Sequence, residues 1–377
     1  MTTPTITTRS LNRAALARQL LLARAPLSTP EGVRRVVALQ AQSPASPYLA
    51  LWNRLAGFDP ATLDAAYADG TVVRATLIRM TLHAAHADDW PVLHGAMAPR
   101  LRDGRLYDQR YTSTGLSDVD GDALLPALAE FAATPRTGTD IETMLTERSG
   151  VPGRWVWWAL RTFAPLHHVP TGGPWAFGPP PATYVAARGS RPAEEAAQAL
   201  VLRYLEGFGP ATLQDIGQFT LMTQSAIRRA ADALGDRLIR FTGPAKAKLL
   251  DVPGGEIPDE DTPAPPRLLP MWDSILLAYA DRSRVVPPAY RPVIFRRNGD
   301  VLPAVLVDGQ VAGVWRATGD GIEVTAFRPL DDPAWHGLTG EARSLIAFLA
   351  GRDPEVYSRY GHWWQKDLPA ADVRTLR

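Results

Sequence analysis

The stretch Arg34-Arg35-Val36-Val37-Ala38-Leu39-Gln40-Ala41-Gln42-Ser43-Pro44 is the part of the chain around which the rest is organised. It begins with the apolar spacing of an amphipathic helix and runs into Pro44 and Pro47, which stop helical continuation. Gln40 and Gln42 stand just before that break. Their side chains share a face only if the chain leaves the helix in an extended conformation. Two neutral carboxamides on one face can then orient a water molecule without carrying charge.

The composition is that of a globular protein long enough for two or three domains, with 377 residues, 46% of them hydrophobic and 21% charged. The net charge is +1, so any attraction to nucleic acid must come from local patches. The absence of cysteine excludes disulfides, thiolate catalysis and cysteine-bound metal clusters. No run of 18 apolar residues occurs, and the polar, Thr-rich start lacks the apolar segment of a signal peptide. We therefore expect a cytoplasmic protein that binds no membrane.

Residues 1–117 are predicted to form a first winged helix, because several helices precede a segment rich in β-branched residues. That segment, residues 71–87, is typical of a hairpin or wing. Four helices are predicted before it, over residues 11–24 with a basic outer face, from Ser28 to the glutamine pair, over residues 46–55 and from Asp59 onward.

Two further winged helices are predicted over residues 118–190 and 191–253. In the second unit, Arg154 to Phe163 is the candidate recognition helix, and residues 167–169 and 174–177 are the candidate wing. In the third unit, helices are predicted over residues 192–205, 212–219 and 222–234, with wing strands over 236–241 and 248–252. This is the helix–turn–helix spacing of a DNA reader.

An internal repeat favours tandem modules. Gly57-Phe58-Asp59-Pro60-Ala61-Thr62-Leu63 recurs as Gly207-Phe208-Gly209-Pro210-Ala211-Thr212-Leu213, each time between two predicted helices. The alternative is a helix-joining turn that arose twice by chance.

The last part, residues 254–377, is predicted to be an acidic linker loop, a β-hairpin meander and a C-terminal helix. Residues 254–266 are rich in proline and acidic residues. Asn298-Gly299 and Asp308-Gly309 are hairpin signals between predicted strands over residues 292–297, 301–307 and 310–315. A fourth strand is predicted over 322–327 and a helix over 340–349, and the tail with Trp363 and Trp364 is expected to pack back.

Several of these motifs together resemble the bacterial winged-helix DNA glycosylases typified by AlkZ and YcaQ. They are Gln-apolar-Gln at 40–42 with the segment 46–55 after it, Arg74 to His83, Ala280 to Val285, and residues 306–309 with 313–316. The resemblance covers most of the chain in order. It implies an α+β protein of three tandem winged-helix modules with a β-rich C-terminal segment, forming a C-shaped, concave DNA-binding surface.

In the resembled family, the Gln-apolar-Gln motif holds the water that attacks the anomeric carbon of a damaged nucleotide. The resemblance therefore implies that Gln40 and Gln42 are catalytic, as in the AlkZ branch, which is associated with bulky or crosslinking damage. From the residues alone, a helix-capping role for the two glutamines is favoured.

Two basic patches, within residues 228–248 and 281–297, could neutralise phosphates, and the alternative for each is a solvated face. His83 is expected, by resemblance, to touch DNA near the active site. The predicted DNA-binding residues are Arg79, His83, Arg154, Gln224, Ser225, Arg228, Arg229, Arg282, Arg284, Arg296 and Arg297.

Metal binding and cofactors are not predicted. His83 and His86 would point to opposite faces of a strand, with no third ligand nearby. Of Trp155, Trp157 and Trp158, we expect at least two to be core residues and not base-stacking platforms.

The predicted partner is double-stranded DNA containing alkylated purines, and the expected activity is monofunctional glycosidic hydrolysis by a monomer. No lysine lies near the glutamine motif in sequence, so a Schiff-base step is not indicated. The alternative is a non-catalytic winged-helix transcriptional regulator, although no dimerisation helix is evident.

Overall fold

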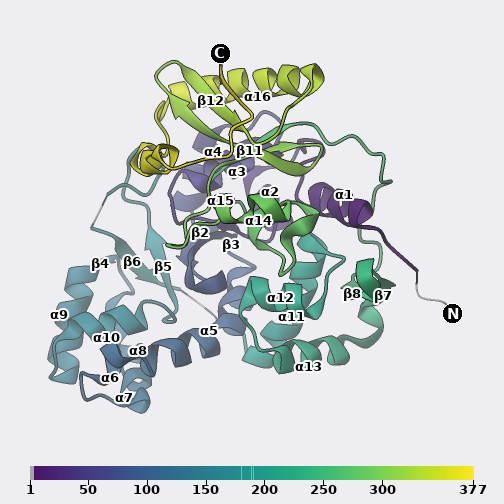
Figure 1. Cartoon of the computed structure of the whole chain (residues 1–377). Helices are drawn as coiled ribbons and strands as arrows, with labels where there is room; N and C mark the ends of the chain where they lie inside the picture. The colour runs from purple at the N-terminus through teal and green to yellow at the C-terminus, as the bar shows by residue number, and fades with distance from the viewer. Residues whose placement is uncertain (1–3, 180, 188, 190) are drawn as a thin grey trace.

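The computed structural model describes residues 4–179, 181–187, 189 and 191–377. Met1 to Thr3, at the start of the predicted first unit, and Ser190, at the predicted end of the second, lie outside the described residues. The fold mixes helices with antiparallel sheets (Figure 1). In that view the C-terminal sheet and α16 lie at the top, and two mainly helical parts lie below.

The first part of the chain contains the helices and the hairpin expected there. Its elements are α1 (Thr8–Arg18), α2 (Thr29–Arg35), β1 (Leu39–Gln40), α3 (Ser46–Arg54), α4 (Pro60–Ala68), β2 (Val72–Thr76), β3 (Leu82–His86) and α5 (Trp90–Leu106). Ser28 and Glu31 form a capping box at α2. The predicted helix 11–24 was too long, since α1 ends at Arg18, and the prediction of a basic outer face was wrong for Arg13 and Arg18, which are buried.

The second part contains α6 (Gln109–Thr112), α7 (Asp118–Ala123), α8 (Leu125–Phe131), β4 (Arg136–Thr137), α9 (Gly138–Ser149), α10 (Gly153–Leu160), β5 (Leu166–Val169) and β6 (Thr183–Ala186). The strand that pairs with residues 166–169 is therefore β6, and the predicted wing strand at 174–177 was wrong. Trp175 and Phe177 are instead buried in a core with α3 and α4. Their aromatic rings made the segment look like a strand.

The first two parts share one sheet. Its strand order is β1-β3-β2-β5-β6-β4, and Arg74 of β2 pairs with His168 of β5. On either side of that pairing, β2–β3 and β5–β6 join consecutive strands, whereas β1–β3 and β4–β6 join strands more distant in the chain. The sheet thus carries side chains of the first part next to side chains of the second.

The third part contains α11 (Ala193–Phe208), α12 (Leu213–Thr220), α13 (Gln224–Leu234), β7 (Ile239–Thr242) and β8 (Lys248–Asp251), close to the predicted bounds. The two copies of the internal repeat differ in detail. Asp59 caps α4 directly before Pro60, whereas α12 begins three residues further along its copy, capped by Thr212 and Asp215.

The C-terminal part contains β9 (Arg267–Leu269), α14 (Ser274–Leu277), α15 (Arg291–Ile294), β10 (Ala304–Val307), β11 (Gln310–Thr318), β12 (Gly321–Ala326), α16 (Asp332–Ala350) and β13 (Asp372–Leu376). They form a five-stranded sheet in the order β13-β12-β11-β10-β9. The predicted strand 292–297 was wrong, because Pro287, Pro288 and Pro292 favour helical turns and cannot donate to a sheet. Strands β9 and β13 were not predicted. The tail packs back as expected, with Trp363 and Trp364 against the core.

Two fully buried ion pairs join distant segments. Arg54 of α3 pairs with Asp273 through two bonds of 2.8 Å, and Arg18 of α1 pairs with Asp251 of β8 at 2.6 and 2.7 Å. Arg18 also donates to the carbonyl of Glu256, so the acidic linker packs over α1. Within the described residues, no helix is long and apolar enough to cross a membrane.

Candidate DNA-binding and active site

Gln40 lies on a strand and not at a helix end. Helix α2 ends at Arg35, and β1 then pairs antiparallel with β3, placing Gln40 opposite His83. The pairing continues one residue further, where the Ala41 amide donates to the Leu82 carbonyl at 2.7 Å. Gln42 lies in the bend that leads to Pro44. The chain therefore leaves α2 through a turn at Val36–Val37 and is extended at Leu39 and Gln40.

Two buried or half-buried arginines hold the glutamine motif through hydrogen bonds. Gln40 is 5% exposed, and its Oε1 accepts a hydrogen bond from Nη2 of Arg79 at 2.9 Å. Arg74 is also buried and donates from Nε and Nη2 to the carbonyl of Ala41 at 3.3 and 3.0 Å. Both the side chain of Gln40 and the peptide between the glutamines are thus held by charged donors.

Arg79 sits on a tight turn between β2 and β3. Arg79 and Met80 both have left-handed backbone angles, with φ of 56° and 58°, a conformation that costs non-glycine residues free energy. The turn directs the Arg79 guanidinium inward, over the ring of Phe219, and leaves Met80 43% exposed. Burial, with Arg282 nearby, lowers the pKa of Arg79 to about 10, so it stays cationic at neutral pH.

His83 is fully buried beside this turn. Its Nδ1 lies 3.0 Å from the carbonyl oxygen of Thr81. Burial, and secondarily Arg79, lowers the pKa of His83 to about 3, so the imidazole is neutral at physiological pH. With no exposed surface, His83 cannot make the predicted contact with DNA in this conformation.

Gln42 is exposed and lines a pocket of about 240 Å³ at the junction of the first and second parts. One wall comes from the hairpin β2–β3, with Thr76, Met80 and Leu82. The other wall comes from α5, the end of α10 and the strands β5 and β6. Its residues are Arg105, Arg161, Thr162, His168 and Tyr184.

The charge in this pocket comes from arginines. Burial, then Arg74 and Arg161, lowers the pKa of His168 to about 3, so its imidazole is neutral. Gln40 does not line the pocket, so the structure gives the two glutamines different surroundings. The sequence did not point to the second wall, because its residues lie 63 or more positions beyond Gln42 and carry no motif.

Most of the predicted DNA-binding residues are accessible. Gln224, Ser225, Arg228 and Arg229 are all exposed on α13, and Arg154 is exposed on α10. In the C-terminal part, Arg297 is exposed, whereas Arg282 and Arg296 are half-buried over the rings of Phe295 and Trp363.

Arg284 was predicted to bind DNA, but the structure buries it. It is buried at 7% exposure, where Nη1 donates to the carbonyl of Pro210 at 3.1 Å and Nη2 lies 3.7 Å from Asp215. The guanidinium also lies over the ring of Tyr279. Through these contacts, Arg284 joins the segment after α14 to the start of α12. Its guanidinium is therefore not free to bind a phosphate.

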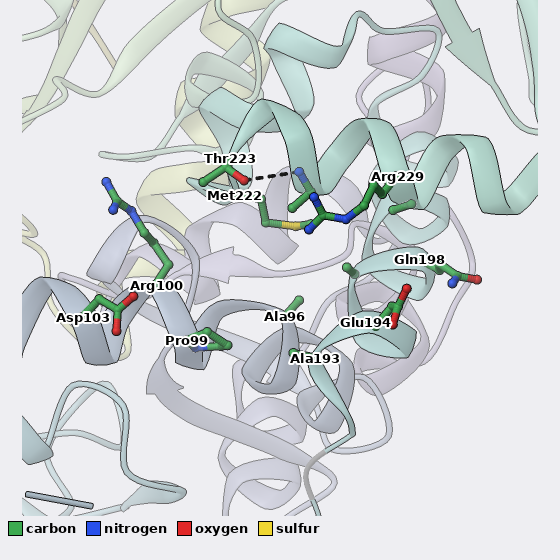
Figure 2. Close-up of a pocket in the computed structure, with 13 residues that line it drawn as sticks. Ala96, Pro99, Arg100, Asp103, Ala193, Glu194, Gln198, Met222, Thr223 and Arg229 are labelled. Atoms are coloured by element: carbon green, nitrogen blue, oxygen red, sulfur yellow. Dashed lines mark hydrogen bonds between the residues drawn. The ribbon is translucent and has the colours of Figure 1, made fainter. Parts of the chain in front are cut away.

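A second, larger pocket of about 440 Å³ lies between α5, α11 and α13. Figure 2 shows Arg100 and Asp103 of α5 on one side and Glu194, Gln198 and Arg229 on the other. Alanines and Pro99 form much of the lining. The rim carries both signs of charge, so the pocket has no clear preference for an anion.

The tryptophan run on α10 is largely structural, as expected. Trp157 is buried, and Trp158 is partly buried against the main core between Arg105 and Arg110, whose guanidiniums lie 4.2 and 4.3 Å from its ring. Among the residues that the structure describes, no group of three or more histidine, aspartate or glutamate side chains could hold a metal ion.

The fold matches that of a solved DNA glycosylase. The structure of Streptomyces sahachiroi DNA glycosylase AlkZ superimposes with a TM-score of 0.76, covering 93% of this chain and 98% of that one at 21% identity. This likeness shows that the two proteins share a fold. A family model described as DNA glycosylase AlkZ-like matches residues 33–348. This protein therefore belongs to the AlkZ-like DNA glycosylase family.

A curated relative is similar over a shorter stretch. The interstrand DNA cross-link repair glycosylase of Streptomyces sahachiroi is 29% identical over 139 residues, which is 36% of this chain and 38% of that protein. The sequence match thus spans little more than a third of the relative's length.

Proposed function

We propose that this protein is a monofunctional DNA glycosylase that hydrolyses the N-glycosidic bond of alkylated purines in duplex DNA. Its substrates would be N7 or N3 adducts, including bulky adducts or interstrand crosslinks such as the curated relative's name indicates. The observation that carries the proposal is the exposed amide of Gln42 in a polar, arginine-lined pocket, directly beside a strand that fixes Gln40.

Neutral amides suit this reaction. A purine alkylated at N7 or N3 already carries positive charge, so it can leave without protonation by the protein. The transition state resembles an oxocarbenium ion, which needs a positioned water and not a strong nucleophile. The Gln42 carboxamide can accept a hydrogen bond from that water or donate one to it.

The two glutamines have different roles in this proposal. Gln42 touches the water, since it faces the pocket. The Oε1 of Gln40 accepts a hydrogen bond from Arg79, and the Gln40 side chain is buried. It reaches the water only if DNA binding shifts Arg79 or the turn that carries it.

We further propose that the helices and hairpins form three winged-helix modules over residues 1–117, 118–190 and 191–253. In the third, α12, α13 and the β7–β8 hairpin have the order of a helix–turn–helix with a wing. The exposed arginines of α10, α13 and the C-terminal part would then face duplex DNA across a concave, C-shaped surface. Three unlike modules in one chain suit a monomer.

The product would be an intact abasic site. The described residues that line the Gln42 pocket include no lysine to form a Schiff base. We expect no cofactor. A non-catalytic regulator is not favoured, because the family to which the chain belongs is described as DNA glycosylase AlkZ-like.

The test is base release from duplex DNA containing N7-methylguanine or a bulky N7 adduct, scored as alkali-labile strand breaks. Gln42→Ala should lower the single-turnover rate by at least about a hundredfold, in the range for a lost positioning or electrostatic group. Gln40→Ala should lower it less, by about tenfold.

Gln198→Ala is the matched control, because this glutamine lines the other pocket. Wild-type-like rates in Gln42→Ala would refute the role of Gln42. Absence of release by the wild type, together with tight binding to one undamaged sequence, would favour the regulator.

A further inference from the structure

Two guanidinium groups share the small Gln42 pocket without a carboxylate to neutralise them. Arg161 is exposed and Arg105 is half-buried. Neither has an ion-pair partner among the residues that the structure describes. Asp108 has an electrostatic effect on Arg105, but its carboxylate pairs with Arg110 at 3.1 Å. The local balance of charge is therefore positive.

The surrounding residues hold Arg105 in place and leave Arg161 accessible. Arg105 donates from Nε to Oγ1 of Thr162 at 3.1 Å and stacks on Trp158, which leaves its terminal amino groups available. Arg161 lines the same pocket as Tyr184 and interacts with it electrostatically. Burial, then Arg110 with a smaller contribution from Arg161, lowers the pKa of Arg105. Two like charges held close together are costly until an anion binds between them.

The pocket is small and otherwise neutral. Its volume of about 240 Å³ is below the roughly 300–1,000 Å³ of drug-sized ligand sites, so a bulky purine adduct does not fit inside it. The sugar that loses its base becomes cationic, and it would be repelled by unpaired arginines. The anion that always accompanies that sugar is the DNA phosphate.

We propose that the Gln42 pocket holds a phosphate of the lesion strand next to the damaged nucleotide, with Arg161 and Arg105 donating to its anionic oxygens. This inference rests on the proposed function and specifies how the site seats its substrate. The wall formed by α5, α10 and β5–β6 thereby positions the sugar at Gln42, while the modified base stays outside the pocket. Arg161 and Arg105 are positioning residues and do not take part in bond cleavage.

The experiment measures binding to a duplex with a stable abasic analogue, by fluorescence anisotropy with the full chain. A second set of duplexes carries one neutral methylphosphonate, either 5′ or 3′ to the analogue. Wild-type protein should lose roughly tenfold in affinity at one of the two positions, as expected for one charge-assisted contact. Arg161→Gln should bind the unmodified duplex roughly tenfold more weakly and show no further loss with the methylphosphonate.

Arg161→Lys should recover part of the affinity, since lysine keeps the charge but not the two-pronged geometry. Arg148→Gln is the matched control, because Arg148 is exposed on α9 outside the pocket. It should keep both the affinity and the methylphosphonate penalty. Thermal melting of each variant confirms that it is folded.

The inference is overturned if Arg161→Gln binds the unmodified duplex as tightly as the wild type does. It is also overturned if the methylphosphonate weakens binding of Arg161→Gln as much as it weakens binding of the wild type. These outcomes are independent of catalysis. If the wild type releases no base from alkylated DNA but Arg161→Gln loses the phosphate contact, only the proposed activity fails. If the wild type releases base and Arg161→Gln is unaffected in binding, only the phosphate site fails.

Discussion

At the scale of single residues, the sequence located the glutamines but not the groups that hold them. Gln40 and Gln42 stand out because they precede a Pro-x-x-Pro break. Arg74 and Arg79 contact the motif from 33 and 39 positions away in the chain. Such contacts depend on the register of β1 against β3, which no local spacing encodes. The second wall of the pocket is more distant still.

His83 makes the stability of the protein depend on pH. Its pKa is about 3 in the folded state and near 6.5 when unfolded. Between those values the unfolded chain binds more protons, so this contribution to stability is fully present above pH 6.5 and is lost as pH falls toward 3. His83→Asn removes the titration and keeps a donor for the Thr81 carbonyl.

The free energy of unfolding should therefore fall less steeply between pH 6.5 and 4.5 in His83→Asn than in the wild type. The difference should be at most about 1.4 kcal/mol per pH unit. Urea denaturation at a series of pH values measures it. His336→Asn, exposed on α16, is the control for losing an imidazole elsewhere. Parallel pH profiles for His83→Asn and the wild type would contradict the prediction.

At the scale of elements, amphipathic spacing predicted where helices form better than local composition predicted which arginines are exposed. The exposed and buried faces of α13 follow its sequence pattern, so Arg228 and Arg229 are exposed as expected. Arg284 has the same charge and lies in a basic run, but its surroundings bury it. Its partners, Pro210 and Asp215, come from the start of α12. Local composition cannot distinguish a phosphate ligand from such a structural contact.

Substitutions of Arg284 and Arg228 should therefore have different effects, the first on stability and the second on DNA binding. Arg284→Ala should destabilise the fold by about 2 kcal/mol, because it leaves the Pro210 carbonyl without its donor and removes the cation beside the buried Asp215 carboxylate. Arg228→Ala should leave stability unchanged but weaken binding to duplex DNA and reduce the slope of log affinity against log salt by about 0.9. Thermal melting and salt-dependent anisotropy of both variants test the pair. An Arg284→Ala protein that melts like the wild type would show that its contacts are dispensable.

At the scale of the whole molecule, the chain is less modular than its sequence suggests. The predicted units follow helix and turn signals, which are local. The structure, however, joins the first two parts through β2 and β5, and one core combines residues of α2, α3 and α4 with residues of β9 to β13 and α16. Sheet pairing and core sharing across more than 200 residues have no local signature.

The C-terminal part should accordingly be required for the first part to fold. Removing residues 254–377 would leave Arg54 without its ion-pair partner Asp273. The Asn53 amide would lose its acceptor, the Leu268 carbonyl, and the Ala38 carbonyl would lose its donor, the Ser274 hydroxyl. Loss of one partner from a buried ion pair alone costs about 3–5 kcal/mol, a large share of the total stability of a typical domain. A fragment of residues 1–253 should therefore show no cooperative thermal transition by circular dichroism, whereas the full chain melts cooperatively. Because Leu39 and Ala41, the neighbours of Gln40, belong to this shared core, the fragment should also fail to release alkylated purines. A cooperatively melting 1–253 fragment would instead establish the C-terminal part as an appended module, and the first part as self-sufficient.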